Sequence, residues 1–210
     1  MSGTGFLEIE YTRRREPLLP ARACLLVIDV QERLVPAMPP EIAERVIKNT
    51  QVLINAMATF GLPIVVSQQY PKGLGATVAP IAEALADAEA RGSAVHRFDK
   101  VEFSAAQWPE FHSLPPAQLT GALMAREQWI VAGMEAHVCV YQTVRDLVGP
   151  ACAVHVVSDA VSSRTKANWR IGIDLMRETG ARITSTEVVV FDLLKQAGTE
   201  QFKALSKTIR

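Results

Sequence analysis

Short apolar stretches recur along this chain, and each is rich in β-branched residues. Runs of roughly four to eight apolar residues, bounded by polar segments, indicate strands that are buried in a sheet. The predicted strands are Ala23–Ile28, Pro63–Ser67, Ala94–Arg97, Trp129–Ala132, Ala153–Val157 and Arg182–Ser185.

The segments between these runs place apolar residues at helical spacing, which predicts amphipathic helices. Two further segments of this kind follow the last strand. The predicted helices are Glu41–Phe60, Ala79–Arg91, Pro116–Arg126, His137–Leu147, Lys166–Thr179, Glu187–Lys195 and Glu200–Lys207.

Strand and helix alternate along the chain, as in a series of βαβ units. Because the strands are apolar on both faces, helices must cover both sides of the sheet. The sequence therefore predicts an α/β fold, a three-layer α/β/α sandwich with a doubly wound six-stranded parallel sheet. At 210 residues we expect a single domain over residues 1–210, with residues 1–20 as an N-terminal arm.

Composition and charge argue against a nucleic acid or a membrane as partner. The 22 basic residues balance the 22 acidic ones. The one basic run, Arg13–Arg15, is too short to form a basic groove, so we expect no nucleic acid partner. No stretch reaches the ~18 apolar residues of a membrane span, and the first twenty residues lack an apolar leader core. Three cysteines without metal or disulfide spacing predict a cytoplasmic protein without a structural zinc.

In a doubly wound sheet, ligands bind beyond the carboxyl ends of the strands, so chemistry is expected there. Asp29 ends the first predicted strand, Lys100 follows the third, and Cys139 follows the fourth near the start of a helix. A carboxylate, an ammonium group and a thiol at one edge could supply covalent catalysis. The helix dipole and the lysine are expected to favour the thiolate of Cys139.

Each of these residues also has an ordinary interpretation. Asp29 could cap a helix, Lys100 could be a solvated surface lysine, and Cys139, between two valines, could be core packing. His137 is two residues before Cys139 and faces another side of the helix, which favours capping or exposure over a role as base. Nucleotide binding is excluded, because no glycine-rich phosphate loop follows a strand.

Taken together, these residues resemble the isochorismatase-like cysteine hydrolases. The shared pattern is Asp29 with Gln31 at the end of the first strand, Lys100 after the third, and Gly133 followed after five residues by Cys139. The segments SQQYPKGLGATV and GMEAHVCV are similar to the isochorismatase-domain-containing branch. The resemblance implies a catalytic triad of Asp29, Lys100 and Cys139.

The resemblance also implies a cis peptide bond between Met134 and Glu135. Backbone N–H groups of Glu135 and Cys139 would then form an oxyanion hole. Homo-oligomerisation is a further expectation that comes from the family.

Two departures from the family refine the expected reaction. Nicotinamidases of this superfamily carry an Asp-x-His metal site after the second strand, where this chain has Ser67-Gln-Gln-Tyr70, so we expect no metal or other cofactor. Isochorismatases proper generally lack a cysteine nucleophile, so Cys139 indicates acyl chemistry on a C–N bond. Ala136 stands where much of the family has threonine.

The resulting hypothesis is a metal-independent cysteine hydrolase of a small-molecule amide, ureide or related C–N bond. Residues expected to contact the substrate, from their position at the same edge, are Gln31, Leu34, Gln69, Tyr70 and Phe103. The alternative is a scaffold or regulatory binding protein that retains the fold without catalysis.

Overall fold

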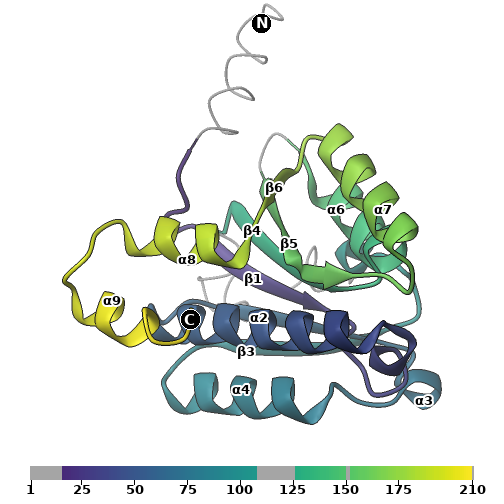
Figure 1. Ribbon diagram of the computed structural model, residues 1–210, viewed down its shortest axis with the longest axis horizontal. Helices are drawn as coiled ribbons and strands as arrows, with labels where there is room; N and C mark the ends of the chain where they lie inside the picture. The colour runs from purple at the N-terminus through teal and green to yellow at the C-terminus, as the bar shows by residue number, and fades with distance from the viewer. Residues whose placement is uncertain (1–15, 108–125, 150–151, 210) are drawn as a thin grey trace, which may run out of the picture.

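The computed structural model describes residues 16–107, 126–149 and 152–209. They contain a six-stranded sheet in the order β3-β2-β1-β4-β5-β6, in which all neighbouring strands run parallel (Figure 1). The strands are β1 (Ala23–Ile28), β2 (Ile64–Gln69), β3 (Val95–Lys100), β4 (Gln128–Met134), β5 (Ala153–Ser162) and β6 (Arg182–Thr184).

Helices cover both faces of the sheet, as the continuous apolar strands require (Figure 1). One face carries α2 (Pro40–Thr59), α4 (Ala79–Ala90), α8 (Thr186–Leu194) and α9 (Glu200–Leu205). The other face carries α6 (Tyr141–Leu147) and α7 (Lys166–Glu178). Short elements are η1 (Val35–Ala37), α3 (Pro71–Leu74), η2 (Ala105–Gln107) and the π turn η3 (Ala136–Val140). The predicted three-layer sandwich is confirmed.

The two central strands form the middle of the core. Every residue of β1 and β4 is buried, and their side chains point alternately into the two layers of helices. Burial of this apolar surface is the main favourable contribution to folding, at roughly 25 cal/mol per Å². The sheet is therefore a rigid support for the loops that follow its strands.

Several predicted boundaries were wrong in an informative way. β3 continues through Lys100 and β5 continues through Ser162. The apolar pattern ended both strands earlier because their last residues are polar, but these residues still pair with a neighbouring strand. Leu18 is 1% exposed and packs in the core, so the N-terminal arm ends before residue 20. Of the predicted helix Pro116–Arg126, only Arg126 is among the described residues. The basic run Arg13–Arg15 lies outside them.

Within the described residues, no helix combines the length and the apolar character that crossing a membrane demands.

Gly133 allows β4 to lie against β1 where the two strands end. Its φ is +122°, and a Cβ built on it would overlap the backbone of Ile28, its partner in the sheet register. We expect Gly133→Ala to lower the free energy of unfolding by at least about 2 kcal/mol, because both the backbone conformation and the space exclude a side chain. Urea unfolding followed by circular dichroism measures the change.

Gly149→Ala is the matched control. Gly149 has no positive φ, and no atom of the described residues lies within 4 Å of the place that a Cβ would take, so the stability of this variant should stay within about 0.5 kcal/mol of the natural protein. Equal stability of the two variants would contradict the role assigned to Gly133.

Candidate active site

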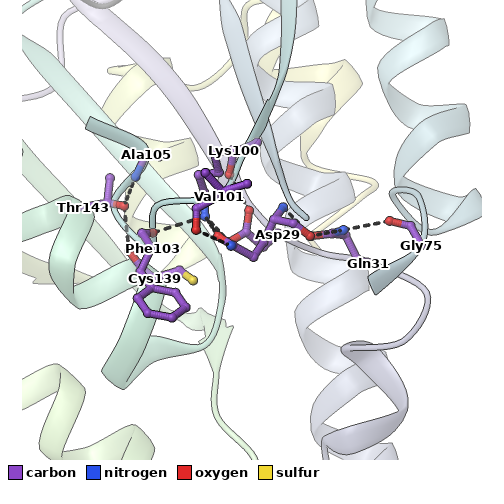
Figure 2. A network of polar contacts seen from close by, with 11 residues as sticks. Asp29, Gln31, Gly75, Lys100, Val101, Phe103, Ala105, Cys139 and Thr143 are labelled. Carbon is purple, nitrogen blue, oxygen red and sulfur yellow. Dashed lines mark hydrogen bonds and ion pairs between the residues drawn. The ribbon is translucent and has the colours of Figure 1, made fainter. Parts of the chain in front are cut away.

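The ends of three neighbouring strands bring the predicted carboxylate and lysine together. Asp29 directly follows β1, Gln69 ends β2, and Lys100 ends β3. Because neighbouring strands are about 4.8 Å apart, roughly 10 Å separates β3 from β1. Lys100 Nζ lies 2.7 Å from Asp29 Oδ2 (Figure 2). The extended Lys100 side chain, this hydrogen bond and the Asp29 side chain together bridge the distance across β2.

The ammonium group of Lys100 uses all its donors on protein acceptors. It donates to Asp29 Oδ2 at 2.7 Å, to Gln69 Oε1 at 2.7 Å and to the Phe103 carbonyl at 3.2 Å. An ammonium group has three N–H donors, so none is spare. The second oxygen of Asp29 accepts a hydrogen bond from Ser67 Oγ at 2.7 Å. The ion pair is thus buried, satisfied and held in one position.

Gln31 and Gln69 support this ion pair. Gln31 Oε1 accepts from the Gln69 backbone N–H at 2.7 Å, and Gln31 Nε2 donates to the carbonyls of Gln69 and Gly75 at 3.0 and 2.7 Å (Figure 2). Gln69 Nε2 donates to the Val101 carbonyl at 2.8 Å. These amide groups are bonded to protein partners and hold the ion pair in place, and their contact with a substrate stays a prediction.

The other residues expected to line a pocket are spread around this site. Leu34 is half-buried and packs against the core cluster. Tyr70 and Phe103 are about half exposed, at 53% and 52%. A groove of about 370 Å³ beside β3 is lined by Tyr70, Pro71, Lys72, Asp99, Lys100, Val101 and Glu102. Lys100 therefore borders the groove, whereas Cys139 is not among its lining residues.

Cys139 lies in a π turn directly after β4, where the sequence predicted the start of an α-helix. The Glu135 carbonyl accepts hydrogen bonds from the backbone N–H groups of Val138 and Val140, at 3.0 and 3.2 Å. Single π turns are frequent at functional sites. The turn changes the direction of Cys139 relative to the α6 helix that follows.

Two contacts fix the π turn from outside. Thr143 Oγ1 donates to the Cys139 carbonyl at 2.6 Å and accepts from the Ala105 backbone N–H at 2.8 Å, linking the turn to the segment after Lys100 (Figure 2). On the opposite side α7 passes close by, because Gly172 leaves room for the Ala136 carbonyl. The peptide bond between Met134 and Glu135, directly before the turn, is cis.

The surroundings of Cys139 favour the protonated thiol over the thiolate. Burial raises the pKa of Cys139 to about 12, the Asp29 carboxylate acts in the same direction, and the Lys100 ammonium acts in the opposite one. The Lys100 ammonium acts in the predicted direction, but burial and the Asp29 carboxylate outweigh it, so the thiolate is not the favoured form at neutral pH. The sequence shows that a lysine is near, but not that its charge is already paired with Asp29.

The thiol and the ion pair lie at the switch point of the sheet. Strand order reverses between β1 and β4, and such points are where doubly wound sheets bind ligands. Asp29 follows β1 and Cys139 follows β4, so the carboxylate and the thiol lie on the two sides of this point.

A second ion pair, which the sequence did not predict, flanks the π turn that carries Cys139. Glu135 is 7% exposed, and its Oε2 accepts hydrogen bonds from the backbone N–H of Arg164 at 2.9 Å and from its Nε at 3.1 Å. His137 Nδ1 lies 3.0 Å from Ser163 Oγ, so this ring faces the loop after β5. The position of Arg164 after a strand end was the signal that could have identified it.

The described residues contain no group of three His, Cys, Asp or Glu side chains that could hold a metal ion. At the carboxyl end of β2, Ser67 is bonded to Asp29 and Gln69 is bonded to Lys100. The donors there are a hydroxyl and an amide, which are weaker metal ligands than carboxylate and imidazole.

Comparison with known proteins assigns a family to this fold and site. The isochorismatase domain model matches residues 23–188. The secreted isochorismatase effector Isc1 of Phytophthora sojae is 39% identical over 95% of this chain and 90% of its own length. Isochorismatase domain-containing protein 1 of Danio rerio is 33% identical over 92% of this chain, which spans 62% of that protein.

Among solved structures, that of MAR1 ribonuclease from Caenorhabditis elegans superimposes with a TM-score of 0.78. It is 33% identical in sequence, and the match covers 92% of each chain.

The protonated thiol predicts a particular pH profile for alkylation. Because the thiolate fraction rises tenfold per pH unit below the pKa, the rate at which iodoacetamide alkylates Cys139 should rise about tenfold per unit from pH 7 to 10 without a plateau. Asp29→Asn removes a charge that raises the pKa and should make alkylation faster at pH 8. Peptide mass spectrometry separates Cys139 from Cys24 and Cys152. A plateau below pH 8 in the natural protein would contradict this assignment.

Proposed function

Because the chain belongs to the isochorismatase family, whose members are generally hydrolases, we propose that it is a metal-independent cysteine hydrolase of small-molecule amides, ureides or related C–N bonds. The observation that carries the proposal is the thiol of Cys139 at the switch point, within electrostatic reach of both Asp29 and Lys100. Nucleophile, base and cation are the minimum for acyl transfer by a thiol.

In the first half of the reaction, Asp29 removes the thiol proton as Cys139 Sγ attacks the carbonyl carbon. Lys100 stabilises the thiolate character as it develops, since its charge lowers the pKa of the thiol. We assign the oxyanion hole to the backbone N–H groups of Glu135 and Cys139. Asp29 then gives its proton to the leaving nitrogen, the C–N bond breaks, and a thioester remains on Cys139.

In the second half, Asp29 takes a proton from water, and the resulting hydroxide attacks the thioester carbonyl. The C–S bond breaks, the acid is released, and the proton returns to Cys139. Asp29 thus serves as base twice and as acid twice, a role that its fixed position beside Lys100 supports. No step requires a metal ion, which agrees with the hydroxyl and amide at Ser67 and Gln69.

The alternative function is that of a binding or regulatory protein without catalysis. The raised pKa of Cys139 favours it, because a protonated buried thiol reacts slowly by itself. The buried ion pair argues against it, because a binding protein gains nothing from the charges of Asp29 and Lys100, which well-packed apolar residues could replace without loss of stability.

The cytoplasmic localisation and the homo-oligomeric state stay predictions. The cysteine content indicates a cytoplasmic protein, whereas the Phytophthora relative is named as secreted. Homo-oligomerisation rests on the family resemblance. Tyr70, Val101 and Phe103 expose apolar surface near Lys100, which is compatible with a substrate or with a second subunit.

Incubation with a panel of small amides, ureides and esters, followed by intact-mass spectrometry, tests the hydrolase. We expect an acyl adduct of at least one compound on the natural protein and none on Cys139→Ala. Asp29→Asn should lose at least about 100-fold in turnover, because general acid–base catalysis typically contributes that much.

Cys152→Ala is the matched control, since Cys152 is a partly exposed thiol away from the triad, and the variant should keep the adduct. An RNA oligonucleotide in the same panel covers the activity after which the Caenorhabditis elegans protein is named. Turnover that survives in Cys139→Ala would exclude the proposed mechanism.

A further inference from the structure

A cleft of about 620 Å³ lies at the amino ends of β5 and β6, where residues of α8 and of the chain before β1 also line it. His155 of β5 lines it and pairs in the sheet with Arg182, the first residue of β6. Asp29, Lys100 and Cys139 lie at the opposite, carboxyl ends of their strands. Small-molecule sites typically have volumes of roughly 300 to 1,000 Å³. The cleft is therefore large enough for a ligand of its own, separate from the proposed reaction.

His155 is buried in the wall of this cleft without a hydrogen bond. It is 3% exposed, and neither of its ring nitrogens has a partner within the described residues. Burial and the nearby charge of Arg182 lower the pKa of His155 to about 4, while the Asp192 carboxylate acts in the opposite direction. The ring is therefore neutral at pH 7 and offers one N–H donor and one acceptor. Because buried polar groups nearly always have partners, an unpartnered ring in the wall of a cleft points to a ligand.

Arg182 supplies the charge that is available in the cleft. Its Nη1 donates to the Glu16 carbonyl at 3.0 Å, and among the described residues its Nε and Nη2 have no partner. The opposing charge, Asp192, is already bonded through both oxygens. One accepts from the Leu18 backbone N–H at 2.7 Å and the other from Lys195 Nζ at 3.0 Å. The polar end of the cleft therefore favours an anion.

The rest of the cleft has an apolar wall. Val188 and Phe191 of α8 line it and are 57% and 44% exposed, although both side chains are apolar. They are three residues apart and so lie on one face of the helix. Ile183 and Leu18 extend the same wall. An aromatic ring or a short alkyl chain on this wall would remove its apolar surface from water.

We propose that this cleft binds a small carboxylate with an aromatic or aliphatic body, and that the carboxylate accepts hydrogen bonds from Arg182 and His155. A guanidinium fork matches the two oxygens of a carboxylate. The ring of His155 donates the N–H that no described protein group accepts. Asp29, Lys100 and Cys139 do not line the cleft, so this site is independent of the proposed hydrolase and goes beyond it.

Two probes that differ only in their polar end test the site. Hydrocinnamate carries a carboxylate, and hydrocinnamyl alcohol carries a neutral hydroxyl on the same aromatic body. Isothermal titration calorimetry gives the two dissociation constants, and their ratio cancels the apolar contribution that the probes share. Neither probe contains a C–N bond, so the result does not depend on whether the protein is a hydrolase.

We expect hydrocinnamate to bind at least about tenfold more tightly than the alcohol, as for the gain of one hydrogen bond between charged groups. Arg182→Met should abolish this preference and leave the affinity for the alcohol unchanged. Arg170→Met is the matched control. Arg170 is also an exposed arginine, lies on α7 and does not line the cleft, so its variant should keep the preference.

The ring of His155 reports on the contact directly. Its nitrogen and proton NMR signals, assigned by their loss in His155→Phe, should shift when hydrocinnamate is added to the natural protein. Binding of neither probe, as expected if another part of the chain or a second copy fills the cleft, would overturn the proposal. So would equal affinity for the two probes, a preference that survives in Arg182→Met, or an unchanged His155 signal.

Discussion

The site depends on one interaction, the buried ion pair between Asp29 and Lys100. Neither charge could be buried alone, because an unpaired ion in the interior costs several kcal/mol, and removing one partner typically costs about 3 to 5 kcal/mol. The pair can form only because β3, β2 and β1 are neighbours in that order. Ser67, Gln69 and the Phe103 carbonyl then satisfy the remaining donors and acceptors.

The same pairing controls the reactivity of Cys139. An isolated lysine beside a buried thiol would lower its pKa, but this lysine is neutralised by a carboxylate that is also close to the sulfur. The thiol therefore remains protonated, and its proton acceptor is already in place. In the mechanism that we propose, the thiolate forms only as a substrate carbonyl is attacked, and a thiol that stays protonated is less open to alkylation and oxidation in the meantime.

Much of the fold follows from local patterns, because buried strands and amphipathic helices differ in apolar spacing. Ala23–Ile28 was predicted with its observed bounds, and Asp29 and Lys100 were predicted at one edge from strand ends alone. The π turn at Cys139, the full use of the Gln31 and Gln69 amides, and the raised pKa of the thiol could not be predicted. Each depends on contacts between residues that are distant in the sequence, such as Thr143 with Ala105 or Gln31 with Gln69.

The edge of the sheet thus carries two ion pairs that differ in how many of their donors are bonded to protein. On one side of Cys139, every donor of Lys100 is bonded to protein, so the position of its ammonium group is fixed. On the other side, Glu135 holds only the near edge of the Arg164 guanidinium, which is 57% exposed. Burial explains the difference, because a buried cation must have all its donors satisfied, whereas an exposed one can leave some of them to water.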